Sequence, residues 1–229
     1  MLRREEALQK LYQARFSQAE RYRGAVWRII CRRVFSRYVP KSSKVLDLGA
    51  GWGEFITNIE ADRKYAMDLN PETGNRLPGE VRFLHQDCSL PWPLESGTLD
   101  VVFTSNFLEH LPNKQSVEET VSQAYRCLRG GGSFICMGPN IRYLPGSYWD
   151  YWDHQIPLTD HSCAELLRSI GFTVERSMAR FLPYSMSRGN RPPLFLVDLY
   201  LRLPVLWPLF GRQFLIIARK PAAISGAAP

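Results

Sequence analysis

A short apolar stretch followed by a glycine-rich turn is the part of the chain best suited to binding a ligand. Residues 45–48 read Val-Leu-Asp-Leu, and glycines follow at positions 49, 51 and 53. A dinucleotide-binding turn would place its third glycine at position 54, where this chain has Glu54. A carboxylate there opposes a pyrophosphate, which depends on free backbone N–H groups and on the positive end of a helix. The turn therefore predicts a ligand with an adenosine-like body and no phosphate.

A second stretch, residues 143–154, carries side chains suited to holding another reactant. It reads Tyr-Leu-Pro-Gly-Ser-Tyr-Trp-Asp-Tyr-Trp-Asp-His. Flat aromatic faces and polar tips suit a pocket for a sugar or an aryl group. The substrate-binding residues predicted on this basis are Tyr148, Trp149, Tyr151 and Trp152. The alternative interpretation is that these rings only pack a lid.

Two histidines are candidates for moving a proton. His154 is the first candidate for a general base, because an imidazole titrates near neutral pH, and Asp153 or Asp150 would orient it. His110 is the second candidate and follows an apolar stretch at residues 99–104. A structural role competes in both cases, with His154 bonded to a loop carbonyl and His110 capping a turn before a proline.

Other kinds of site lack their motifs in this chain. A phosphate-binding loop needs Gly-Lys followed by Ser or Thr, and a hydrolase nucleophile needs the pattern Gly-x-Ser-x-Gly. The five cysteines are scattered, and no His-x-x-x-His or Cys-x-x-Cys pair occurs, so the sequence predicts no metal site. An odd number of scattered cysteines also argues against a disulfide framework and favours a reducing cytoplasm.

Alternating strands and helices must position these residues. After a helical segment at 1–38, which the pattern divides near Gly24, strand and helix signals alternate, as in a parallel sheet covered on both faces. Helices are expected near 53–60, 113–129 and 161–170, the last of them ending at Gly171, and the pair Gly131-Gly132 is expected to turn into the fifth strand. The expected strands are 44–48, 64–68, 81–85, 99–104, 133–138, 172–178 and 213–219.

This order of signals resembles the class I S-adenosylmethionine-dependent methyltransferases, and within them bacterial enzymes that act on small molecules and glycans. The resemblance covers residues 40–220. It implies an α/β, Rossmann-like, mostly parallel sheet of seven strands in the order 3-2-1-4-5-7-6, with helices on both faces. It also implies that S-adenosylmethionine lies across the carboxyl ends of strands 1 to 4, as ligands do in open α/β sheets.

The resemblance implies a role for each strand-end residue. Asp47 attracts the methionine ammonium, Asp68 accepts both ribose hydroxyls, and Asp87 accepts from the adenine amino group. Asn106 contacts the methionine half, and glycines let the backbone approach the ligand closely. The complete cofactor-binding set predicted is Asp47, Gly49, Gly51, Gly53, Asp68, Leu69, Asp87, Cys88 and Asn106.

The distribution of charge limits the partners. The formal net charge is +7, but residues 1–44 hold twelve Lys or Arg and three Asp or Glu, so the remainder is slightly acidic. A basic segment outside the cleft argues against nucleic acid as a partner. Residues 192–210 are apolar but are interrupted by Asp198, Arg202 and two prolines, which excludes a transmembrane helix. They form either an interfacial patch for a membrane or a lipid-linked acceptor, or a cap packed on the sheet or on another subunit of a homodimer.

The sequence thus predicts a basic helical cap at 1–40, a methyltransferase domain at 41–220 with an apolar insertion at 180–211, and a flexible tail at 221–229. The leading hypothesis is O-methylation of a small-molecule or glycan hydroxyl, as in polysaccharide biosynthesis, by a cytoplasmic enzyme or one peripheral to the inner membrane surface. The alternatives are N- or C-methylation of another metabolite, and a binding module that has lost turnover.

Overall fold

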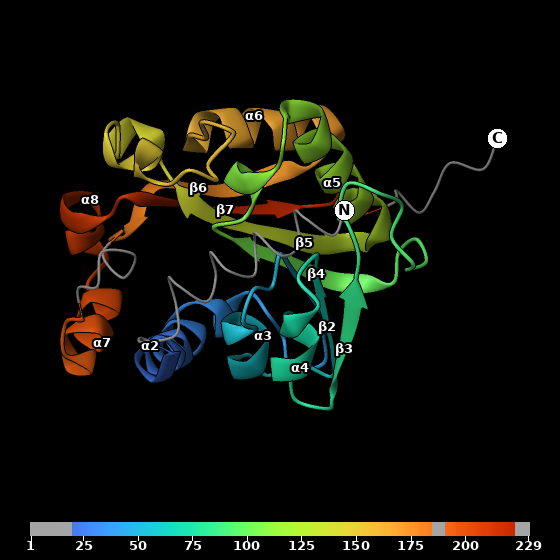
Figure 1. Cartoon of the computed structure of the whole chain (residues 1–229), viewed down its shortest axis with the longest axis horizontal. Helices are drawn as coiled ribbons and strands as arrows, with labels where there is room; N and C mark the ends of the chain where they lie inside the picture. The colour runs from blue at the N-terminus through green and yellow to red at the C-terminus, as the bar shows by residue number, and fades with distance from the viewer. Residues whose placement is uncertain (1–19, 185–190, 223–229) are drawn as a thin grey trace.

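Seven strands form one sheet in the order β3-β2-β1-β4-β5-β7-β6, as the sequence predicted (Figure 1). The computed structural model describes residues 20–184 and 191–222. Neighbouring strands are parallel except around β7, which runs antiparallel to both β5 and β6. The strands are β1 Lys44–Leu48, β2 Arg63–Asp68, β3 Val81–His85, β4 Leu99–Ser105, β5 Leu128–Pro139, β6 Thr173–Leu182 and β7 Gln213–Arg219.

Helices cover both faces of this sheet. Figure 1 shows α5 and α6 on one face and α2, α3 and α4 on the other. Each face has its own apolar core, and β7 contributes to both, with Phe214 and Ile216 on the α5–α6 side and Leu215 and Ile217 on the α2–α3 side. The helices are α2 Glu20–Arg33, α3 Glu54–Asn58, α4 Glu72–Arg76, α5 Lys114–Cys127, α6 Asp160–Ile170, α7 Leu194–Arg202 and α8 Trp207–Phe210.

Four aromatic rings fix α2 and α3 against the middle of the sheet. Phe55 of α3 stacks on Phe103 of β4 with ring centroids 3.6 Å apart. Trp27 of α2 meets Phe103 edge-on at 6.0 Å, and Phe35 of the 3₁₀ turn Phe35–Arg37 meets it at 4.9 Å. Perpendicular and offset pairs of this kind add to the stabilisation from burial. The cluster therefore holds α2 beside the carboxyl ends of β1 and β4.

Several element boundaries differ from the sequence-based ones. Helix α2 runs through Gly24 without a break, because the roughly 1 kcal/mol that glycine costs in a helix is offset by the buried face of the helix. Strand β5 begins at Leu128, since Leu128 pairs with β4 and Gly131 donates to the Lys220 carbonyl instead of forming a turn before the strand. Gly171 ends α6 in the left-handed region, as predicted. Residues 1–19 of the predicted cap and 223–229 of the predicted tail lie outside the described residues.

The segment before β7 exposes many apolar side chains. It comprises α7, a 3₁₀ turn at Pro204–Leu206 and α8. Leu201 is buried, but its neighbours on the outer side face solvent. Of the helices in the described part of the chain, none has both the length and the apolarity needed to cross a bilayer. The exposed large apolar residues of this segment, called here the α7–α8 patch, are Leu194, Phe195, Leu196, Leu199, Leu203, Val205, Leu209 and Phe210.

Asp198 joins α7 to α2 through charged hydrogen bonds. Both of its oxygens accept from Arg33, at 2.6 and 3.0 Å, and Arg202 lies 2.8 Å away. The Arg33 hydrogen bonds, together with Arg202, lower the pKa of Asp198 to about 2. Because the folded-state pKa lies below the ordinary value of 3.8, this stabilisation is fully present above pH 4 or so and is lost as pH falls through about 2.

Replacing Asp198 by Asn should therefore lower the melting temperature at pH 7, and the difference from the unmodified protein should shrink as the pH approaches 2. Thermal unfolding followed by circular dichroism between pH 2 and 7 measures this. Asp62→Asn is a suitable control, because Asp62 is exposed and its ion pair with Arg63, at 4.0 Å, is exposed as well. If Asp198→Asn lowers the melting temperature equally at pH 2 and pH 7, the stabilisation does not come from the ionised Asp198 carboxylate.

Candidate active site

The glycine turn joins β1 to α3 at the carboxyl end of the sheet. Gly49, Gly51 and Gly53 have φ angles of +68°, +57° and +74°, a region that side chains other than glycine rarely adopt. The Gly49 N–H donates to the Met67 carbonyl at 2.9 Å and so ties the turn to β2. A Cβ on Gly49 would lie 2.1 Å from the ring of Phe107. Both the conformation and the packing of this turn therefore require glycine at position 49.

Two carboxylates flank the turn at the ends of β1 and β2. Asp47 is buried and accepts a hydrogen bond of 3.3 Å from the Ile56 N–H. Burial raises the pKa of Asp47 well above its usual range. Asp68 accepts from the Gly51 N–H at 2.7 Å and from the Asn70 N–H at 2.8 Å, and burial raises its pKa as well. Backbone donors therefore fix both carboxylates beside the turn.

A third carboxylate follows β3. Asp87 accepts from both the N–H and the hydroxyl of Ser89, at 3.0 and 2.7 Å. Its neighbour Cys88 is buried, and burial raises the pKa of this thiol to about 12. The Cys88 side chain is therefore neutral, and it lies 3.4 Å from the hydroxyl of Thr120 on α5.

Two cavities lie at this edge of the sheet and share part of their walls. The larger, of about 180 Å³, extends from the glycine turn to α2, and the smaller, of about 80 Å³, lies beyond the carboxyl ends of β2 and β3. His110 and Asp153 line both of them. The larger is lined among others by Arg23, Asp47, Gly49, Asn106, Tyr151 and His154, and the smaller by Asp68, Leu69, Asp87, Cys88 and Phe107. Eight of the nine predicted cofactor residues thus divide between these two adjacent cavities, and Gly53 lines neither.

Asn106 occupies the turn after β4 in a strained conformation. Its φ of +50° is the only positive value among the non-glycine residues that the structure describes. Its N–H donates to the Met137 carbonyl at 2.9 Å, while its buried Oδ1 atom has no hydrogen-bond partner in the protein. An unsatisfied buried acceptor is costly, by roughly 1–3 kcal/mol, so this oxygen suits a ligand that donates a hydrogen bond.

Only one of the four predicted substrate-binding aromatic residues lines a cavity. Tyr151 does so, whereas Trp149 and Trp152 are 53% and 89% exposed and line neither. Tyr148 is fully buried, and its hydroxyl bonds the Ile156 carbonyl, so it supports the segment from inside. Tyr148 lies directly behind His154, with ring centroids 4.6 Å apart. Tyr148, Trp149 and Trp152 therefore lie outside the walls of both cavities.

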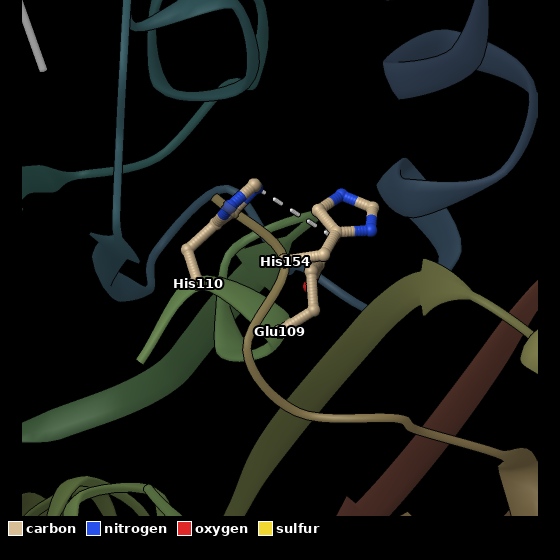
Figure 2. Close-up of side chains that lie close together, drawn as sticks. All are labelled: Glu109, His110 and His154. Atoms are coloured by element: carbon tan, nitrogen blue, oxygen red, sulfur yellow. Dashed lines mark ion pairs between the residues drawn. The ribbon is translucent and has the colours of Figure 1, made fainter. Parts of the chain in front are cut away.

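The two candidate histidines come together from different elements, as Figure 2 shows. Their rings lie 4.9 Å apart, His110 following β4 and His154 following β5. Asp153, predicted to orient His154, holds His110 instead: Nδ1 of His110 lies 3.2 Å from its carboxylate and 3.1 Å from its carbonyl. Burial opposes a charged imidazole, but Asp153 and Glu109 outweigh it and raise the pKa of His110.

Two residues of this region, Arg23 and Glu109, were not predicted from the sequence, and Glu54 was considered there only as a group that opposes a pyrophosphate. Arg23 of α2 and Glu54 form an ion pair of 2.6 Å in the wall of the larger cavity. Glu109 is only 1% exposed and lies against the two histidines (Figure 2). The sequence signal that could have identified Glu109 is its position next to His110. Its burial could not be predicted, because it depends on how the segment after β5 folds over it. The sequence signal that could have identified Arg23 is its position in the basic N-terminal segment.

Known proteins resemble this chain in sequence. Residues 46–136 match the methyltransferase domain family. The chain is 35% identical over 80 residues to methyltransferase str2 of Strobilurus tenacellus, an alignment that covers 32% of this chain and 28% of that protein. It is 27% identical over 158 residues to a probable S-adenosylmethionine-dependent methyltransferase of Mycolicibacterium smegmatis, covering 67% and 60% of the two chains. The chain thus spans less than two thirds of either curated relative.

A solved structure shares the fold. The S-adenosylmethionine-dependent methyltransferase from Archaeoglobus fulgidus superposes with a TM-score of 0.66 at 20% identity, covering 90% of this chain and 99% of that one. The strand order and the matched domain at residues 46–136 resemble those of the class I S-adenosylmethionine-dependent methyltransferases. The cofactor of this class is S-adenosylmethionine, and the glycine cradle and the free Oδ1 of Asn106 are groups that fit it.

Replacing Gly49 by Ala should weaken the binding of S-adenosylhomocysteine by about tenfold or more, because the methyl group meets Phe107 and the backbone is strained by roughly 1–3 kcal/mol. Isothermal titration calorimetry measures the affinity. Gly24→Ala is the matched control, since a Cβ there meets no atom within 4 Å and α2 should become slightly more stable. Unchanged affinity in Gly49→Ala would contradict this reading of the turn.

Proposed function

We propose that this protein is an enzyme that transfers the methyl group of S-adenosylmethionine to a hydroxyl of a small-molecule or glycan acceptor. The observation that carries the proposal is the placement of two imidazoles in the larger cavity, directly beside the glycine turn. Methyl transfer is an in-line displacement, which needs a positioned nucleophile and exclusion of water. A hydroxyl acceptor also has a proton to lose, and imidazoles suit a site where a hydroxyl must become a nucleophile.

The cofactor-facing residues divide according to the two cavities. In this proposal Asp68 receives the ribose hydroxyls, while Asp87 and Cys88 border the adenine in the smaller cavity. Asp47 and Asn106 border the methionine half in the larger one. When bound there, S-adenosylmethionine supplies a methyl group activated by the positive charge on its sulfur.

The acceptor side of the larger cavity is formed by residues after β5 and from α2. Tyr151 offers an aromatic face, and His154 is our candidate for contacting the acceptor hydroxyl. His110 is positioned beside it by Asp153. These residues orient the acceptor and limit the water around it. Arg23 and Trp27 close the cavity from the side of α2.

A discriminating test measures turnover and cofactor binding separately. The protein is incubated with S-adenosylmethionine and a panel of hydroxylated sugars and phenols, and S-adenosylhomocysteine is quantified. His154→Ala should lower the rate by roughly 100-fold or more while calorimetric binding of S-adenosylhomocysteine stays within about twofold. His85→Ala is the control, because His85 is exposed on β3 and lines neither cavity. Unchanged turnover in His154→Ala would remove it from the acceptor site.

N- or C-methylation and cofactor binding without turnover are the alternatives that the same assay separates. A panel that includes amines and activated carbon acids distinguishes the atom that is methylated. Binding of S-adenosylmethionine with no product from any acceptor would favour a binding module.

The place of the protein in the cell is proposed from the α7–α8 patch. Eight exposed large apolar side chains lie within 17 residues, and the exposed guanidinium groups of Arg32 and Arg202 lie close by around Asp198. Apolar side chains together with basic ones suit the surface of an anionic membrane. In this proposal a cytoplasmic enzyme contacts the inner membrane surface, where a lipid-linked glycan would be its acceptor. A homodimer that buries the patch is the alternative.

Pelleting with liposomes tests the membrane contact. The protein should sediment with vesicles that contain about a third phosphatidylglycerol and should sediment less with pure phosphatidylcholine. Phe195→Ser with Val205→Ser should reduce sedimentation, since both side chains are exposed and the fold does not depend on them. If sedimentation does not depend on lipid and analytical ultracentrifugation shows a dimer, the α7–α8 patch would be the contact with a second copy of the chain and not with a membrane.

A further inference from the structure

A buried carboxylate and two imidazoles form a cluster beside the reaction space. Suitable atoms of Glu109, His110 and His154 all lie within 4.8 Å of one another (Figure 2). The Glu109 side chain is enclosed, yet its Oε1 atom accepts no hydrogen bond from the protein. A carboxylate oxygen that is buried without a donor loses its hydration and gains little in return. The cluster therefore needs a proton or a cation for compensation.

The orientation of His110 leaves one of its ring nitrogens directed at the cluster, where a cation could bind. Its Nδ1 atom faces two acceptors, the carboxylate and the carbonyl of Asp153, at 3.2 and 3.1 Å. Since neither acceptor carries a hydrogen when the carboxylate is ionised, Nδ1 carries the proton and donates it. Nε2 then faces the cluster and lies 3.9 Å from Oε1 of Glu109. A histidine that donates one ring N–H to a carboxylate or a carbonyl is the usual arrangement of a metal ligand.

We propose that Glu109, His110 and His154 bind a divalent transition-metal ion. Two imidazole nitrogens and one carboxylate oxygen suit zinc, manganese, iron or cobalt, whereas magnesium and calcium prefer oxygen ligands throughout. Metal–nitrogen distances of about 2.1 Å imply ligand atoms roughly 3.3 Å apart, so binding draws these atoms, now within 4.8 Å of one another, together by up to about 1.5 Å.

The fourth position of the metal would open toward the acceptor. His110 and His154 both line the larger cavity, and Tyr148 closes the other side of His154. Three protein ligands with one open position are typical of catalytic rather than structural metal sites. If the proposed methyltransferase function holds, a hydroxyl bound at that position becomes more acidic, because the cation stabilises its deprotonated form. His154 then acts as a metal ligand, and not as the free general base that the sequence suggested.

The test uses Co²⁺ as a spectroscopic probe on the full chain after treatment with EDTA and desalting. Titration should produce ligand-field absorption bands that saturate at one Co²⁺ per chain. Glu109→Gln and His154→Ala should each weaken Co²⁺ binding by at least about tenfold. His161→Ala should bind like the unmodified protein, because His161 is 75% exposed on α6. Equal binding in all four proteins, or no saturable binding in the unmodified one, would overturn the proposal.

A second measurement does not depend on the folding of a variant. Pulsed electron paramagnetic resonance of the unmodified protein with Mn²⁺ should show coupling to two imidazole nitrogens. Coupling to water protons alone would place the ion elsewhere and overturn the site. Calorimetry with S-adenosylhomocysteine on the same metal-free sample separates the two proposals. Retained cofactor binding without metal binding overturns the metal site only, and metal binding without cofactor binding overturns the proposed function only.

Discussion

The site depends on one backbone contact between segments that are distant in the sequence. The main-chain carbonyl of Glu109 accepts from the N–H groups of Gln155 and Ile156, at 2.8 and 3.1 Å. This bifurcated acceptor fastens the loop after β5 onto the turn after β4, and so brings His154 to His110. The same contact covers the Glu109 side chain, which explains why a carboxylate between two loops is almost completely buried. Together with the contact of Asp153 with His110, it fixes the wall of the larger cavity that carries Tyr151 and His154.

The strands of the sheet were predictable because they depend on local signals, whereas their order was implied by the family resemblance. Parallel strands buried on both faces produce near-continuous apolar runs, and β1, β3 and β7 have the predicted bounds. A strand-end carboxylate such as Asp68 is brought to the edge of the sheet by the strand that precedes it, whatever the rest of the chain does. Glycine is required at position 49 for two reasons. The positive φ angle is a local property of the turn, whereas the close approach of the Phe107 ring comes from another loop.

The acceptor side was less predictable because no periodicity governs the segment after β5. Tyr148, Tyr151 and Trp152 are similar in type and close in sequence, yet they are buried, cavity-lining and 89% exposed respectively. The difference comes from a short 3₁₀ turn at Ser147–Asp150 and from the Tyr148 hydroxyl, which bonds the chain eight residues later. Likewise, Asp153 is adjacent to His154 in sequence but is fixed on His110 by packing between two loops. Such contacts are tertiary, and residue types alone do not specify them.

Three buried carboxylates around the larger cavity are compensated in different ways, and the contrast indicates where ligands act. Asp47 accepts a backbone N–H, Glu54 is paired with Arg23, and Glu109 has one oxygen without a donor. Burial raises the pKa of all three, so each one costs folding free energy at neutral pH. The Ile56 N–H and the Arg23 guanidinium offset part of the first two costs, and His110, 3.9 Å from Oε1 of Glu109, offsets part of the third. At the metal site proposed above, a bound cation would supply the remaining compensation for Glu109.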